Sequence, residues 1–171
     1  MRKAKWAVLA VSIVLVLTAV LAPAVVARPS GGPSLTPASG TWSWVVNEKS
    51  VKVTALPDGN QFLTGYEIGT WKGTFAGSAR EPFEAMFIGA NGLWATLTIN
   101  FKGKVGGVSG KMTMLVIAYA PNYAKDSPVA MNGSWWIQKG FGRLHDLHGA
   151  GTWTTHLDES ATTYTGNLWF K

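Results

Sequence analysis

The sequence contains no cysteine, and only 14% of its 171 residues are charged. The absence of cysteine excludes disulfide bonds, thiolate metal ligands and thiol nucleophiles. Because few residues are charged, a large apolar fraction is left to be buried. Its bulkiest side chains belong to nine tryptophans, seven phenylalanines and four tyrosines. A domain of this composition must therefore be held together by the packing of large side chains.

A convincing helical period is also missing from the sequence. Short apolar or alternating stretches occur instead, separated by turn residues such as Asn91-Gly92, which is typical of β-strands joined by tight turns. The predicted strands are residues 41–46, 51–56, 62–75, 82–88, 93–102, 112–119, 134–138, 151–157 and 162–170. Their short connections favour antiparallel pairing of neighbouring strands.

The stretch from Asn132 to Trp153 alternates glycines with bulky apolar residues. This rhythm suits strands whose backbones approach closely and does not suit the interior of a helix. Closure of about eight strands into a cylinder would also remove the exposed edges of an open sheet. The sequence therefore predicts an all-β fold, a closed antiparallel β-barrel of about eight strands, that follows an N-terminal hydrophobic signal helix.

The N-terminus has the three parts of a secretory signal peptide. Basic residues at positions 2, 3 and 5 precede a long uncharged apolar run, and Ala27 ends a group of small residues suited to cleavage. We therefore predict a signal peptide at 1–27, a proline- and glycine-rich linker at 28–39 and the barrel at 40–171. In the alternative, residues 6–27 stay uncleaved and anchor the domain to the outer face of the membrane; otherwise the protein is secreted.

The charge of the mature chain is modest. Removal of residues 1–27 takes away three of the fifteen basic residues and none of the nine acidic ones, which leaves a net charge of +3. The remaining basic residues are scattered singly, whereas nucleic-acid-binding proteins usually carry a basic stripe or patch. We therefore expect no nucleic-acid partner.

Glu67 is the acidic residue of most interest. In the predicted strand that contains it, the large apolar side chains occupy odd-numbered positions, so strict alternation turns Glu67 toward the interior. A carboxyl group in an apolar cavity has a raised pKa and can serve as an acid, a base or a hydrogen-bonding group for a ligand. The alternative places Glu67 at the barrel mouth or in a pair with a lysine.

Other combinations of polar residues give weaker indications. His145, Asp146, His148 and His156 have no known zinc spacing, so no metal site is predicted. No serine lies in the G-x-S-x-G context of hydrolases. The acid pairs Glu81 with Glu84 and Asp158 with Glu159 lie beside a proline or in a predicted turn, which indicates solvated charges.

Three segments resemble one family of small barrels. Residues 135–152 follow the pattern W-x-I-x-x-G-x-G-x-L-x-x-L-x-G-x-G-T, with Trp135 in the first place, residues 101–110 follow F-x-G-x-x-G-G-x-S-G, and residues 69–77 follow G-x-W-x-G-x-F-x-G. These patterns are similar to those of bacterial and archaeal barrels related to allene oxide cyclase. The resemblance implies an eight-stranded antiparallel barrel of the class that also contains plant dirigent proteins.

The resemblance sets the functional expectations. Its plant branches steer reactive intermediates inside an apolar cavity without a cofactor, but their catalytic motif has no residue-by-residue match in this chain. We predict an interior that binds a small hydrophobic ligand and uses no cofactor. Its predicted lining comprises Glu67, Trp71, Phe101, Met114 and Trp135. The alternatives are a cofactor-free cyclase or isomerase with Glu67 as the catalytic residue, and a structural module that forms homo-oligomers.

Overall fold

The structure is a computed structural model that describes residues 34–89, 92–121, 130–156 and 162–171. These residues form nine strands: β1 (Thr36–Val46), β2 (Lys52–Ala55), β3 (Gln61–Gly73), β4 (Phe75–Ile88), β5 (Gly92–Val105), β6 (Val108–Ala120), β7 (Ala130–Phe141), β8 (Leu147–His156) and β9 (Thr162–Phe170). Two single-turn 3-10 helices, η1 (Glu48–Ser50) and η2 (Gly142–Leu144), accompany them. In the described part of the chain no helix is long and apolar enough to span a membrane. The all-β prediction is confirmed, and the predicted signal helix lies outside the described residues.

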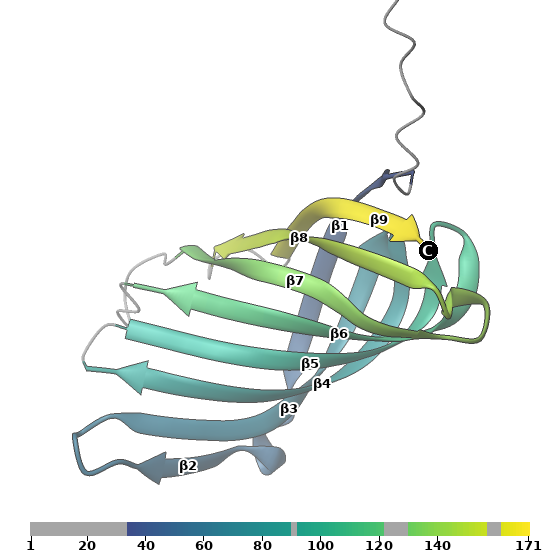
Figure 1. Ribbon diagram of the computed structural model, residues 1–171. Coiled ribbons are helices and arrows are strands. Elements are labelled where there is room, and N and C mark those ends of the chain that lie inside the picture. The colour runs from purple at the N-terminus through teal and green to yellow at the C-terminus, as the bar shows by residue number, and fades with distance from the viewer. Residues whose placement is uncertain (1–33, 90–91, 122–129, 157–161) are drawn as a thin grey trace, which may run out of the picture. The chain divides into compact units, whose positions relative to one another are not determined.

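Eight of the strands close into an antiparallel barrel (Figure 1). From β3 to β9 each strand pairs with the next along the chain, and β1 closes the ring because it pairs with both β9 and β3. The ninth strand, β2, lies outside this ring. It pairs with residues 61–64 of β3, whereas β1 pairs with residues 67–73 of the same strand. The predicted closed barrel of about eight strands is thus confirmed, with one additional strand.

Side chains alternate between the inside and the outside of the barrel, as β5 shows most clearly. Leu93, Leu97 and Phe101 of this strand are buried, whereas Trp94 on the opposite face is 45% exposed. The alternation follows from the pleat of a β-strand, in which successive side chains point to opposite faces. The inward and outward faces predicted for β5 are therefore correct.

The barrel begins earlier than the sequence predicted. β1 starts at Thr36, so the last four residues of the predicted linker at 28–39 belong to a strand. They pair with β9 between Thr165 and Leu168, and Ala38 is buried. Pro37 misled the prediction because proline is rare inside sheets. It is tolerated here because this part of β1 has a partner on one side alone.

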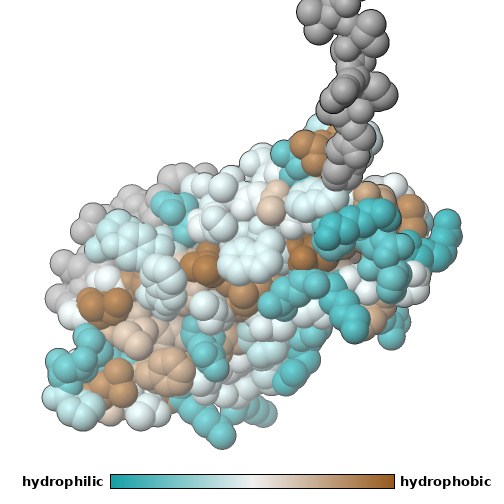
Figure 2. All heavy atoms as spheres, in the orientation of Figure 1, coloured by the Kyte–Doolittle hydropathy of each residue, from teal (hydrophilic) through white to brown (hydrophobic). Residues whose placement is uncertain are grey.

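The two ends of the barrel interior differ. At the end near η2, aromatic rings pack against one another around Phe75, whose ring centroid lies 5.1 Å from that of Tyr164 and 5.4 Å from that of Trp135. On the outside of this end hydrophilic side chains gather, as Figure 2 shows. Exposed lysines of β5, β6 and β7 contribute to this surface: Lys102, Lys104, Lys111 and Lys139. Packed rings therefore fill the interior at this end, and a cavity remains at the other.

Candidate functional site

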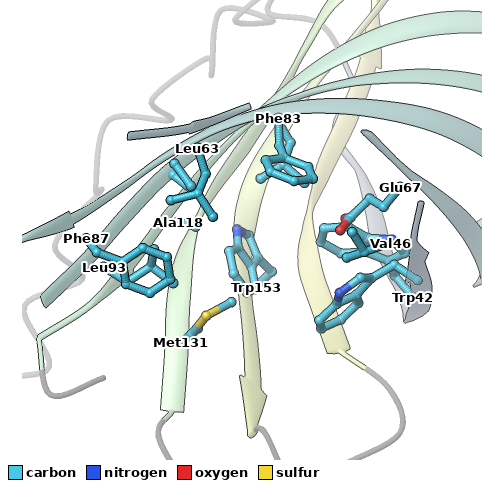
Figure 3. A pocket seen from close by; sticks show the side chains of 14 residues that line it. Trp42, Val46, Leu63, Glu67, Phe83, Phe87, Leu93, Ala118, Met131 and Trp153 are labelled. Atoms are coloured by element: carbon cyan, nitrogen blue, oxygen red, sulfur yellow. The ribbon is translucent and has the colours of Figure 1, made fainter. Parts of the chain in front are cut away.

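A cavity of about 180 Å³ occupies the end of the barrel interior where β4 ends and β5 begins (Figure 3). Five aromatic side chains form much of its wall: Trp42, Trp44, Phe83, Phe87 and Trp153. Aliphatic side chains, among them Leu63, Leu93 and Met131, complete the lining. Among the fourteen described residues that line the cavity, Glu67 is the only one with an ionisable side chain. The site is thus an apolar cavity with one carboxyl group.

Glu67 faces a second carboxyl group across the β3–β4 pair. Glu67 and Glu81 are direct cross-strand partners, and the two residues are 5% and 0% exposed. The Trp71 indole N–H donates a hydrogen bond to Glu81 Oε1 at 2.8 Å, and the Trp42 indole N–H donates one to Glu81 Oε2 at 3.1 Å. Both oxygens of Glu81 therefore have donors, and the site contains a buried pair of acids.

The two tryptophans that bind Glu81 support each other. Trp42 and Trp71 are cross-strand partners on β1 and β3, and their rings stack with a centroid distance of 4.8 Å and an interplanar angle of 10°. Stacking fixes the direction of both indole N–H groups, because each ring has little room to turn. The closure of the barrel by β1 thus also completes the hydrogen bonds to the carboxyl pair.

Gly69 provides the space that the Glu81 carboxyl group occupies. A Cβ atom at Gly69 would lie only 1.9 Å from Glu81 Oε1, and the three heavy atoms nearest to it all belong to Glu81. Any side chain at this position would therefore displace the carboxyl group. This explains one glycine of the segment 69–77 in terms of the site.

Burial dominates the electrostatics of the pair. Loss of hydration raises the pKa of Glu67 to about 7, although its hydrogen bond with Glu81 lowers it in part. Burial raises the pKa of Glu81 to about 9, opposed by the hydrogen bond from Trp71 and reinforced by the charge of Glu67. Two interacting acids titrate as a unit. Between these values the pair retains about one proton and carries one negative charge.

This arrangement supports two kinds of chemistry. An acid whose pKa lies near 7 can donate a proton to a bound molecule or accept one from it, and it can also hydrogen-bond to a ligand. Glu67 is the member of the pair that borders the cavity, whereas Glu81 does not belong to its lining. A reacting or binding group in the cavity would therefore meet Glu67 first.

The structure separates the five predicted lining residues. Glu67 lines the cavity, and Trp71 lies behind it and binds Glu81. Phe101, Met114 and Trp135 are buried in the packed interior and do not border the cavity. Their inward direction was predicted correctly, but the sequence did not indicate which inward residues would leave space.

The prediction for Glu81 was wrong. Its position beside Pro82 indicated a solvated charge in a turn, yet β4 runs straight through both residues from Phe75 to Ile88, and Glu81 is fully buried. The odd-numbered residues of this strand include Phe75 and Ala79, and their alternation was the signal that could have placed Glu81 inside. Glu84, its predicted partner, is exposed on the opposite face.

The two histidines whose side chains the structure describes, His145 and His148, do not form a cluster around the site. His145 and Asp146 contact each other on the surface after η2, and His148 stacks on Trp169 with a centroid distance of 5.9 Å. The His156 side chain, Asp158 and Glu159 lie outside the described parts. Across residues 34–89, 92–121, 130–156 and 162–171 no group of three potential metal ligands comes together.

Comparisons with known proteins identify the fold alone. The chain is similar to the crystal structure of a protein of unknown function from the DUF3224 family of Shewanella oneidensis MR-1. The TM-score is 0.63 at 12% sequence identity, and the match covers 81% of this chain and 98% of the other. No family model matches the sequence, and no curated protein matches it.

Proposed function

We propose that this protein is an exported β-barrel that binds a small, largely apolar molecule in its cavity. One observation carries the proposal: the end of the interior where β4 ends and β5 begins contains about 180 Å³ of space with an apolar lining and a single carboxyl group. Ligand sites typically combine apolar walls with a few well-placed polar groups. A structural barrel without a ligand would instead be filled with side chains at both ends.

The volume limits the size of the ligand. An apolar cavity of about 150 Å³ accommodates benzene, whereas drug-sized ligands occupy pockets of about 300 Å³ or more. A cavity of about 180 Å³ therefore suits a molecule with one ring or a short branched chain. Its polar group would lie against Glu67.

Filling the cavity with a side chain tests this proposal. Ala118 lines the cavity, so Ala118→Phe should place a ring where the ligand binds. We expect native mass spectrometry of the full-length protein, after incubation with a metabolite extract, to detect a retained compound that Ala118→Phe no longer retains. Ala150→Phe is the matched control because Ala150 is exposed on the outside of the barrel. Retention of nothing by the wild type, or equal retention by Ala118→Phe, would refute ligand binding in this cavity.

The carboxyl pair favours a second candidate, a cofactor-free isomerase or cyclase related to the allene oxide cyclase-like barrels. In this mechanism Glu67 exchanges a proton with a substrate in the cavity, while Trp42 and Trp71 hold Glu81 beside it. Glu67→Gln keeps the shape of the side chain and removes its acid–base capacity. It should abolish turnover while a compound retained by the wild type still binds.

Export is the remaining part of the proposal, and the N-terminal sequence supports it. The basic positions 2, 3 and 5, the apolar run and the small residues up to Ala27 match a secretory signal. The intact mass of protein recovered outside the cytoplasm should correspond to a chain that starts at Arg28. Recovery of the uncut chain in the membrane fraction would instead support anchoring through residues 6–27.

A further inference from the structure

The negative charge of the carboxyl pair has no positive partner among the residues that the structure describes. The cross-strand neighbours of Glu67 are Val46 on β1 and Glu81 on β4. Arg80, which directly precedes Glu81 in the sequence, points to the outer face. Its guanidinium carbon lies 4.1 Å from the centroid of the Tyr66 ring. No lysine or arginine of the described residues forms an ion pair with either acid. Buried charges in proteins are normally paired, and the described residues offer this pair no counter-charge.

Donor groups are also distributed unevenly over the two acids. Glu81 accepts both indole N–H groups, whereas Glu67 shares a hydrogen bond with Glu81 alone among the described residues. Glu67 is 5% exposed, and the surface left to it faces the cavity. A ligand in the cavity that carries a hydrogen-bond donor could therefore bind the Glu67 carboxyl group.

The wall beside Glu67 is formed by aromatic rings set at different angles. The ring of Trp42 lies 5.3 Å from that of Trp44 at an interplanar angle of 46°, and 5.9 Å from that of Trp153 at 75°. Figure 3 shows the Glu67 carboxyl group beside Trp42 in this wall. Tryptophan faces attract cations through the negative potential of the ring, and cages of this kind recognise ammonium groups.

We propose that the ligand of this cavity is a compact organic cation, an ammonium group on an apolar body, bound by the Glu67 carboxylate and the rings of Trp42, Trp44 and Trp153. The inference rests on the proposed ligand-binding function and names its ligand class. The ammonium group supplies a positive charge, and its N–H groups donate hydrogen bonds to the Glu67 carboxylate. An anion of the same size would meet the charge of the acid pair and be rejected.

A matched pair of probes separates charge from shape. Benzylamine and benzyl alcohol have nearly the same size and each carries one polar group, but only the amine is positively charged at pH 8. We expect isothermal titration of the full-length protein at pH 8 to give at least about tenfold tighter binding for benzylamine, because charge-assisted hydrogen bonds and cation–π contacts are added. Benzyl alcohol should bind weakly in the same cavity.

Two variants show where the preference originates. Glu67→Gln should reduce the amine-to-alcohol affinity ratio to about one while benzyl alcohol still binds, which also shows that the cavity stays intact. Glu84→Gln, which alters an exposed carboxyl group on the outer face of β4, should leave the ratio unchanged. Ala118→Phe should abolish the binding of both probes.

The pH dependence provides an independent readout. Glu81 is the titratable group that faces Glu67 from β4, and the side chains facing it from β1 are uncharged. Between pH 6 and pH 8 the pair loses a proton, because burial places the pKa of Glu67 at about 7. The affinity for benzylamine should therefore rise with pH over this range, and that for benzyl alcohol should not.

The outcomes distinguish the two proposals. If benzyl alcohol binds as tightly as benzylamine or more tightly, the cationic ligand class is wrong and the ligand-binding cavity stands. If Glu67→Gln leaves the amine preference unchanged, the role assigned to Glu67 is wrong. If neither probe binds and no compound is retained from the extract, both the ligand class and the binding function are refuted.

Discussion

At the scale of single residues, Trp42 and Trp71 make it possible to bury Glu81. A carboxyl group inside a barrel loses its hydration, and two indole N–H donors at 3.1 and 2.8 Å replace part of it. The remaining cost of burial raises the pKa values of the acid pair, so the folded protein holds these protons to higher pH. In the unfolded chain both acids are hydrated and have ordinary pKa values, so the difference affects the free energy of unfolding.

This cost predicts how stability depends on pH. Burial raises the pKa values of Glu67 and Glu81 from 4.5 to about 7 and about 9, so the native state binds more protons than the unfolded state in this range. The contribution of the pair to the free energy of unfolding is fully present below pH 4.5 and is lost as the pH rises to about 9. For Glu67 alone the loss is roughly 3 kcal/mol.

Urea unfolding between pH 5 and pH 9 measures this loss. Glu67→Gln should flatten the decrease in stability, because it removes one titrating acid and its repulsion of the other. Glu84→Gln should keep the wild-type profile, because this carboxyl group is exposed on the outer face. A wild-type protein whose stability rises toward pH 9 would contradict the burial of the pair.

At the scale of strands, the pairing of β3 with β4 decides the geometry of the site. Gly69 lies one inward position beyond Glu67 on β3, and the Glu81 carboxyl group from β4 lies over it. The position of the Glu81 carboxyl group therefore depends on a small residue in the neighbouring strand as well as on its own sequence.

A double-mutant cycle tests this dependence. Gly69→Ala should reduce the free energy of unfolding by about 1–3 kcal/mol, because the new Cβ atom displaces the Glu81 carboxyl group from a tightly packed site. In a Glu81→Ala background the same change should cost less than about 1 kcal/mol, since the atoms it meets are gone. Equal costs in the two backgrounds, measured by urea unfolding, would show that the clash is unimportant.

At Gly106-Gly107 the sequence predicted the position of the turn, although the strands on either side extend closer to it than the predicted 93–102 and 112–119. Gly106-Gly107 separates β5 from β6, as expected of such a dipeptide, whereas Gly92 begins β5 and Asn91 lies outside the described residues. The turn at Gly73-Thr74 was missed, and residues 62–75 were predicted as one strand. Gly73 has a φ of +100° and lets the chain reverse within one residue, a conformation that the surrounding β-like sequence conceals.

At the scale of the whole molecule, β1 holds the barrel closed. Its first residues pair with β9 alone, residues 40–42 pair with both β9 and β3, and residues 43–46 pair with β3 alone. Thr74 N–H donates to the carbonyl of Ser39 and Ser39 N–H donates to Thr74 Oγ1, which ties the start of β1 to the β3–β4 turn.

Truncation tests the importance of this start. A chain of residues 34–171 should unfold cooperatively, whereas one of residues 40–171 should be less stable by about 2–4 kcal/mol, because it loses several hydrogen bonds of about 1 kcal/mol each and buried Ala38. Urea unfolding of both chains measures the difference. Equal stability would restore the domain boundary at Gly40 that the sequence predicted.

The sequence by itself determined which residues of most strands face inward and that short connections pair neighbouring strands into a barrel. These are local properties, because the pleat alternates side chains within each strand and a turn depends on a few residues. Only the tertiary structure decided that Glu67 lies opposite Glu81, that Trp42 and Trp71 converge on one carboxyl group, and that rings fill one end of the interior. Register and ring contacts join residues far apart in the chain, and they follow from how all inward side chains share one enclosed space.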